Sequence, residues 1–118
     1  MDQGKANMKK IIILAVAIGV VAAISARGAD AKDNWTKLCA KCHGAEGKGD
    51  TKIGARLGIK DFSDPKVQAS FKDDDAFKDL KNGLQNEDGR TLMKPFDTLS
   101  DDEIKALVAY VRTLKSQP

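Results

Sequence analysis

The hydrophobic pattern begins with one uninterrupted apolar run near the N-terminus. Small and aliphatic residues extend from Ile11 to Ile24, directly after Lys9 and Lys10. Because a membrane-spanning helix needs roughly 20 apolar residues, this run is short for a permanent anchor and typical of a secretory signal peptide. The segment Ala29-Asp30-Ala31 then fits the small-x-small pattern at which signal peptidase cleaves.

We therefore predict a signal peptide over residues 1–31, cleavage after Ala31, and an exported domain over residues 32–118. Met8 stands directly before the two lysines and is an alternative initiator. Two other interpretations of the run stay open, namely an uncleaved membrane anchor and a buried apolar helix.

The end of the exported domain has the clearest helical periodicity. Ser100-Asp101-Asp102-Glu103 is a capping box, with acidic residues in the first turn where the helix dipole favours them. The apolar residues behind it recur at the spacing of one helical face; these are Ile104, Leu107, Val108, Val111 and Leu114. The pattern predicts a helix from Asp101 to about Lys115.

Shorter helices are predicted upstream, and no strand is expected because alternation of β-branched residues never persists. Asp33 or Asn34 caps a first helix that reaches about Lys41, and Asp64-Pro65 opens a second. A third helix covers about Asp74 to Asn82. Glycines predict an irregular loop over residues 44–58, and residues 92–96 cross a loop into the last helix. The fold class is therefore all-α.

The amino-acid composition excludes several classes of protein. A chain of 118 residues forms one small domain, and an aromatic content of only 5% is low for its core. Its 2 cysteines are too few for a disulfide scaffold. The formal net charge is +3, but removal of the predicted signal peptide leaves the charges nearly balanced. Since no basic stripe is interleaved with aromatic residues, nucleic-acid binding is excluded.

The chemistry centres on Cys39-Ala40-Lys41-Cys42-His43. This is the C-x-x-C-H pattern for covalent attachment of a c-type haem. Two thiols at this spacing near a helix end reach the two vinyl groups of the porphyrin, and the adjoining imidazole of His43 ligates the iron. The alternatives are a redox dithiol, a zinc site and a structural disulfide. The first lacks a thioredoxin-like sheet, and the second lacks a fourth Cys or His ligand.

A second axial ligand follows by elimination. His43 is the single histidine of the chain, so the chain itself cannot supply a second histidine ligand. Met1 and Met8 lie in the predicted signal peptide, which leaves Met93 as the methionine of the exported domain. A lone methionine is otherwise core filler, and Lys94 competes as a ligand only when deprotonated at alkaline pH. A Met/His pair fills both axial positions and raises the reduction potential relative to two histidines.

With these residues, the exported domain resembles the class I, single-haem c-type cytochromes of bacteria. Trp35, ahead of the motif, stands where the family carries an aromatic that packs across the C-terminal helix. Met93, Pro95-Phe96 and Leu99-Ser100-Asp101 look like the axial-methionine loop and the entry to that helix. The resemblance implies a small cytochrome c fold of about four short helices and long loops around one covalent haem.

Two departures from the family pattern concern the surroundings of the axial ligands. Many members carry a proline whose carbonyl accepts a hydrogen bond from the second nitrogen of the haem histidine. This chain has Ala55 in the similar stretch over residues 53–58, where a backbone carbonyl still offers an acceptor. The usual Met-Pro dipeptide is here Met93-Lys94-Pro95. We expect a slightly altered path for this loop.

A haem also explains the low aromatic content of the core, because a large apolar ring adds the buried apolar surface that so short a chain lacks. Its expected contacts are Leu38, Leu57, Phe71, Leu80, Met93 and Phe96. We predict that a chain without haem lacks cooperative folding.

The expected function is single-electron transfer between periplasmic or membrane-bound redox partners, by a monomeric carrier that is no enzyme and takes no small-molecule substrate. Lysines near the motif and the methionine would steer an acidic partner; these are Lys41, Lys48, Lys52 and Lys94. The alternatives are a haem enzyme or gas or redox sensor in which Met93 dissociates, and a subunit of a larger oxidoreductase complex.

Overall fold

The fold is given by a computed structural model that describes Gly28 and residues 30–116. The predicted signal peptide over residues 1–31 lies almost wholly outside the described residues, so its extent and cleavage stay predictions. Within the described part of the chain, no helix is long and apolar enough to cross a membrane. The elements below belong to the unit Ala31–Pro118.

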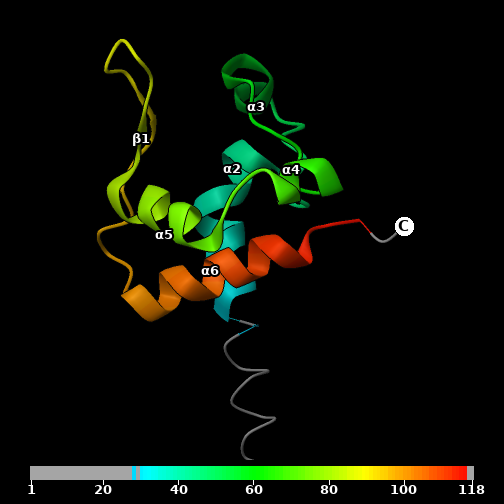
Figure 1. Ribbon diagram of the computed structural model, residues 1–118, viewed down its shortest axis with the longest axis vertical. Coiled ribbons are helices and arrows are strands. Elements are labelled where there is room, and N and C mark those ends of the chain that lie inside the picture. Colours follow the sequence, from blue (N-terminus) through cyan, green and yellow to red (C-terminus); the bar gives the residue numbers. More distant parts are fainter. Residues whose placement is uncertain (1–27, 29, 117–118) are drawn as a thin grey trace, which may run out of the picture. The chain divides into compact units, whose positions relative to one another are not determined.

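Short helices and one small hairpin make up this unit (Figure 1). The helices are η1 (Trp35–Cys39), α2 (Ala40–His43), α3 (Lys52–Leu57), α4 (Pro65–Ala69), α5 (Asp73–Asn82) and α6 (Asp101–Thr113). The strands are β1 (Leu84–Gln85) and β2 (Thr91–Met93), which pair antiparallel with Leu84 opposite Met93. The prediction of a mostly helical fold is confirmed.

The N-terminal helical segment starts before Asp33 and Asn34, the residues predicted to cap it. Helical turns already cover residues 31–34, and Asn34 has helical dihedral angles and makes no side-chain capping bond. The predicted cap at Asp33 or Asn34 is therefore wrong. In η1 the Ala40 N–H bonds to the Trp35 carbonyl, five residues back, so this turn is a π-helix. Capping preferences and apolar spacing do not encode such a widened turn.

Two elements were not expected from the sequence. The glycine-rich stretch contains α3, because the Thr51 hydroxyl caps it by accepting a hydrogen bond from the Gly54 N–H at 2.8 Å. The hairpin β1–β2 replaces part of the predicted loop before α6. Its strands are too short for alternation to be recognised, and the turn between them is closed by the Asn86 N–H on the Arg90 carbonyl at 2.9 Å.

The remaining helices follow their signals. The Asp64 carboxylate accepts a hydrogen bond from the Lys66 N–H, and Pro65 opens α4. Both bonds of the capping box between Ser100 and Glu103 are present at the start of α6. The last helix ends at Thr113, earlier than the predicted Lys115.

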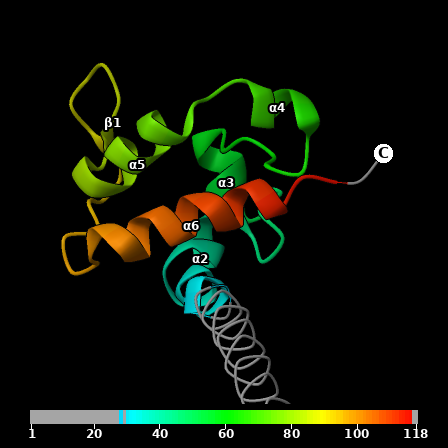
Figure 2. The same cartoon turned by 60° about the horizontal axis from the view of Figure 1, so that its bottom comes forward.

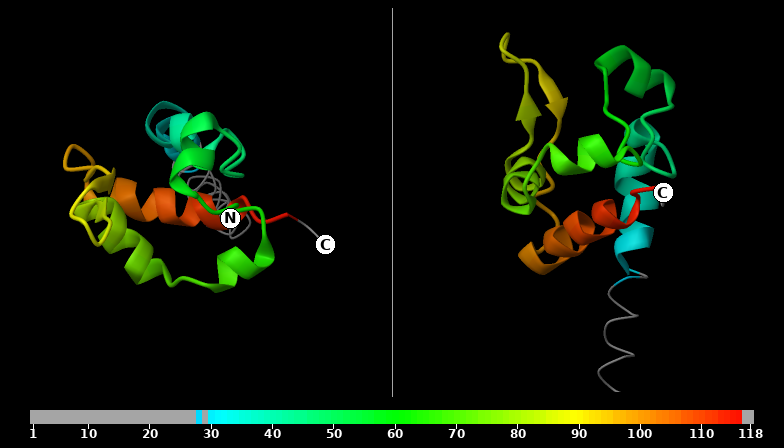
Figure 3. Two further views of the ribbon diagram at one scale, coloured as in Figure 1. Left: turned by 90° about the horizontal axis from the view of Figure 1, so that it is seen from above. Right: turned by 45° about the vertical axis from the view of Figure 1, so that its right-hand side comes forward.

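The core lies where α6 crosses the N-terminal helical segment, a crossing visible in Figures 1 and 2. Trp35 is 3% exposed and Leu107 on α6 is 1% exposed. The indole also contacts Tyr110, with 5.7 Å between ring centroids. The expectation that Trp35 packs across the C-terminal helix is confirmed. In Figure 1 and in the right view of Figure 3, the hairpin and α3 both point away from α6.

Candidate haem site

The two thiols and the imidazole of the motif lie on one continuous helical segment. Cys39 ends η1 and is buried, whereas Cys42 and His43 in α2 are half-buried. The cysteines form no disulfide with one another. Burial, with a smaller contribution from neighbouring Cys42, raises the pKa of the Cys39 thiol to about 11. Cys39 is therefore an uncharged thiol at neutral pH, in contrast to the low-pKa thiolates of redox dithiols.

His43 lies between two aromatic rings. Its ring centroid is 5.3 Å from that of Phe62, with the planes only 18° apart, and 5.7 Å from that of Trp35 at 46°. Burial lowers the pKa of the His43 imidazole below its ordinary value, which favours the neutral form of the ring. A neutral imidazole has the free lone pair that a metal ligand needs.

The backbone that leaves the motif is held by side chains on both sides. The Trp35 indole N–H donates to the carbonyls of Gly44 at 3.2 Å and Ala45 at 3.1 Å. The Thr51 hydroxyl donates to the Cys42 carbonyl at 2.7 Å, which joins the start of α3 to the motif. These bonds fix the position of His43 from the buried indole and from the next helix.

One polar atom in this region is buried without a partner, the Nδ1 nitrogen of His43. The resemblance led us to expect a backbone carbonyl near Ala55 as its acceptor. In the structure no hydrogen-bond partner reaches this atom, so that expectation is not met. Ala55 lies inside the unexpected helix α3, next to Gly54, whose carbonyl accepts hydrogen bonds from the Gly58 and Ile59 N–H groups.

Met93 comes from a different element, the end of strand β2, and is half-buried. The chain approaches closely here: a Cβ on Gly83 would lie 2.7 Å from the Met93 carbonyl oxygen and 2.9 Å from the Pro95 nitrogen. Gly83 also has a φ of 77°, a conformation that favours glycine. Gly83 thus lets α5 end directly against the strand that carries Met93. The two predicted axial ligands therefore lie on separate elements of the chain.

Several large apolar side chains stay exposed on the elements that carry or border these ligands. The exposed fraction is 43% for Leu38, 40% for Leu57, 39% for Leu84 and 42% for Leu92. Two of them, Leu38 and Leu57, are among the predicted haem contacts. The others predicted, Phe71, Leu80, Met93 and Phe96, are half-buried. Protein packing alone therefore leaves these apolar surfaces incompletely covered, which fits a large flat apolar group beside them.

Comparison with known proteins decides the family. The family model for cytochrome c matches residues 28–115. The chain belongs to the cytochrome c family.

Solved structures agree with this assignment. The c-type cytochrome KustC0563 is 31% identical, with a TM-score of 0.61 over 72% of this chain and 96% of the other. A tyrosine-to-phenylalanine mutant named for the same protein is 32% identical, with a TM-score of 0.62 over 73% of this chain and 99% of the other. Among curated proteins, no match is found.

Membership of the cytochrome c family implies a covalent haem c, and the residues present fit that group. The cysteines have the C-x-x-C spacing, the neighbouring imidazole has a buried nitrogen without a partner, and exposed leucines lie on the elements that carry or border the ligands. The predicted cytochrome c fold is confirmed.

Some residues of this cytochrome c domain escaped the sequence analysis. Phe62 and Thr51 contact the motif region from a stretch without helical or strand periodicity. Gln68 and Arg112 join α4 to α6 through hydrogen bonds that link residues far apart in sequence. The sequence shows only that a polar residue, Gln68, follows the apolar Val67 on a short helix. This pattern does not predict which residues Gln68 bonds to.

Proposed function

We propose that this cytochrome carries one haem c bound through thioethers to Cys39 and Cys42, with His43 and Met93 as axial ligands, and that it shuttles single electrons between redox proteins. The observation that carries the proposal is the C-x-x-C-H motif on one helical segment, with His43 at its end flanked by the rings of Phe62 and Trp35. When bound, the haem supplies an iron that alternates between its ferric and ferrous states.

The protein's residues hold the group and limit its chemistry. Cys39 and Cys42 fix one edge of the ring, so the group does not dissociate. With His43 and Met93 both as ligands, the iron would have no position left for a substrate. A thioether opposite an imidazole stabilises the ferrous state relative to two imidazoles and raises the potential. Closed coordination is what distinguishes an electron carrier from a haem enzyme.

Partner recognition would depend on lysines near the ligands. Lys41, Lys52 and Lys94 are exposed. The fourth predicted residue, Lys48, lies 3.2 Å from the Glu46 carboxylate, and this partly offsets its charge. The partner we propose is therefore a redox protein with an acidic surface, and its association weakens as salt rises.

The place of action follows from the predicted signal peptide over residues 1–31. Export would deliver the domain over residues 32–118 to the periplasm, where it would meet membrane-bound or periplasmic partners as a monomer. N-terminal sequencing of the exported protein tests this. A first residue of Lys32 supports cleavage after Ala31, and an N-terminus at Met1 or Met8 contradicts it.

Carbon monoxide binding to the ferrous protein tests the assignment as a carrier. Carbon monoxide needs an open axial position, so the wild-type spectrum should stay unchanged under the gas. The Met93→Ala variant, in which the position is open, is the matched positive control. Strong binding by the wild type would instead favour the haem enzyme or gas sensor in which Met93 dissociates.

A further inference from the structure

The imidazole of His43 lacks the support that usually fixes a metal-bound histidine. Such histidines donate their second ring N–H to a carboxylate, carbonyl or water, and this bond sets the ring orientation. Here Nδ1 is buried without a partner. Rotation about the bond between Cβ and the ring must therefore be restricted by packing.

Phe62 is placed to supply that restriction. Its ring is nearly parallel to the imidazole, at 18° and a centroid distance of 5.3 Å, which is an offset stack. Trp35 contacts the imidazole at a steeper 46° and is itself engaged with Tyr110 on α6. Of these two neighbours, Phe62 is the one whose plane matches that of the ligand.

The backbone of Phe62 is held at both its polar groups. Its N–H donates to the Gly47 carbonyl at 2.8 Å, and its carbonyl accepts from the Gln68 side-chain amide at 2.7 Å. The same amide donates to the Val111 carbonyl at 2.8 Å. Gln68 is 6% exposed, so this amide is buried and fully engaged. Phe62 is thereby joined to both α4 and α6.

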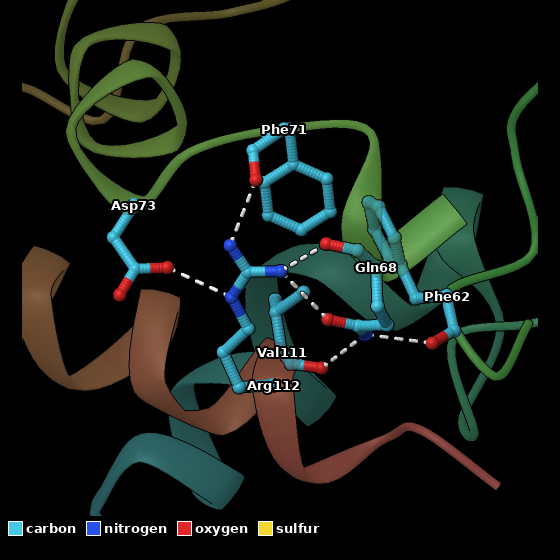
Figure 4. A network of polar contacts seen from close by, with 6 residues as sticks. All are labelled: Phe62, Gln68, Phe71, Asp73, Val111 and Arg112. Atoms are coloured by element: carbon cyan, nitrogen blue, oxygen red, sulfur yellow. Dashed lines mark hydrogen bonds and ion pairs between the residues drawn. The ribbon is translucent and has the colours of Figure 1, made fainter. Parts of the chain in front are cut away.

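Arg112 completes the support from the other side, as Figure 4 shows. Its guanidinium donates to the Gln68 amide oxygen at 3.1 Å, the Phe71 carbonyl at 2.9 Å and the Asp73 carboxylate at 2.8 Å. It also lies 4.1 Å from the centre of the Phe71 ring, which meets Phe62 edge-on at 5.9 Å. A continuous set of contacts thus runs from Arg112 through Phe71 and Phe62 to His43.

We infer that Phe62 is a positioning residue for the axial histidine: its ring, held by Gln68 and Arg112, fixes the plane of the His43 imidazole in place of a hydrogen bond to Nδ1. This rests on the proposed function, since it requires His43 to ligate the haem iron. A consequence follows for the ligand itself. An imidazole whose N–H has no acceptor is less basic, so it stabilises the ferric state less.

Nuclear magnetic resonance of the haem-loaded protein tests the inference. In the oxidised state the haem-methyl resonances depend on the plane of the axial imidazole. The Phe62→Leu variant should change their order or spread, and Phe62→Tyr, which keeps the ring, should restore the wild-type pattern. Phe77→Leu is the matched control, because Phe77 lies on α5 with Lys81 over its ring. Its pattern should stay that of the wild type.

A second measurement needs no variant. In the reduced, diamagnetic wild type, nuclear Overhauser contacts should join the ring protons of Phe62 and His43. Their absence overturns the inference, as does a Phe62→Leu pattern equal to that of the wild type or matched by Phe77→Leu. These results leave the proposed function intact. A wild type without bound haem, seen in its absorption spectrum, overturns both.

Discussion

The two sides of the candidate site are built differently. On the histidine side, Trp35 and Cys39 are in the core and the indole and Thr51 hold the backbone around His43 by hydrogen bonds. On the methionine side, Met93 lies in a hairpin whose Leu84 and Leu92 are 39% and 42% exposed. The first side is formed by the protein's own packing. The second exposes apolar side chains that the protein itself does not cover, as expected where a haem would pack against them.

This difference has a physical basis in the local chain. The histidine side belongs to a helical segment that buries apolar residues against α6. The methionine side is a hairpin of two very short strands, and an isolated hairpin of this kind is marginally stable in water. It is tied to α5 by the hydrogen bond from the Phe96 N–H to the Leu80 carbonyl at 3.0 Å. Four predictions probe the comparison.

Removal of both thiols should have the largest effect. In the Cys39→Ala/Cys42→Ala variant no haem is attached, so the methionine side loses the group that would complete its packing. We expect loss of cooperative unfolding, measured by circular dichroism on heating. Lys41→Ala, an exposed substitution between the two cysteines, is the control and should keep the wild-type transition. A sharp transition in the double variant would refute the dependence of the fold on haem.

Truncation of one leucine on each side should next separate the two regions. Leu107→Ala removes a side chain that is 1% exposed, and it should destabilise the protein by about 2–5 kcal/mol. Leu92→Ala removes one that protein packing leaves 42% exposed, and its cost should be the smaller of the two because only a bound haem would cover it further. Denaturant unfolding of the haem-loaded variants gives both values. Equal costs would mean that the hairpin is packed as tightly as the core.

The Met93→Leu variant should separate packing from ligation. Because leucine has nearly the same volume, the change in packing alone should cost less than about 1.5 kcal/mol, and any larger loss of stability would report the lost iron–sulfur bond. The same change removes the sulfur ligand, so the reduction potential should fall and the ferrous protein should bind carbon monoxide. Potentiometric titration and spectroscopy under carbon monoxide give these readouts. An unchanged potential would show that Met93 is filler rather than ligand.

The smallest effect is expected at an ion pair on the surface between α5 and α6. Lys81 donates to the Asp101 carboxylate at 2.8 Å, and this hydrogen bond lowers the pKa of Asp101 below its ordinary value. A lowered pKa in the folded state stabilises the protein above the ordinary carboxyl pKa, and the stabilisation is lost as pH falls through the folded value.

The Lys81→Met variant keeps the aliphatic stem and removes this charge. Its unfolding midpoint should lie slightly below that of the wild type at pH 7, and the two should converge in acid. Strong salt should reduce the difference as well. A gap that widens as pH falls would assign the effect to packing over Phe77 rather than to charge.

The sequence was most informative where short-range chemistry decides the structure. The capping box at Ser100, the Asp64-Pro65 start of α4 and the C-x-x-C-H motif were all recognisable from adjacent residues. The helix α3 and the hairpin were missed. In α3, glycines at 54 and 58 suggested a loop, although Gly54 donates to the capping Thr51 and Gly58 ends the helix in a left-handed conformation.

The surroundings of His43 could not be predicted for a different reason. The stack with Phe62 and the bonds from Gln68 and Arg112 join residues that are distant in sequence. Such contacts depend on how α4 and α6 meet, which no local pattern encodes. The family resemblance instead suggested a carbonyl near Ala55 as the partner of Nδ1, and the structure leaves that atom without one.

The absorption spectrum of the purified protein in both oxidation states tests the central claim most directly. A covalent haem held by Cys39, Cys42, His43 and Met93 predicts c-type bands in the reduced form that survive denaturation. It also predicts a weak charge-transfer band from iron–sulfur ligation in the ferric form at neutral pH. A ferric spectrum without that band would contradict the Met93 ligand, and a protein without haem bands would contradict the whole account.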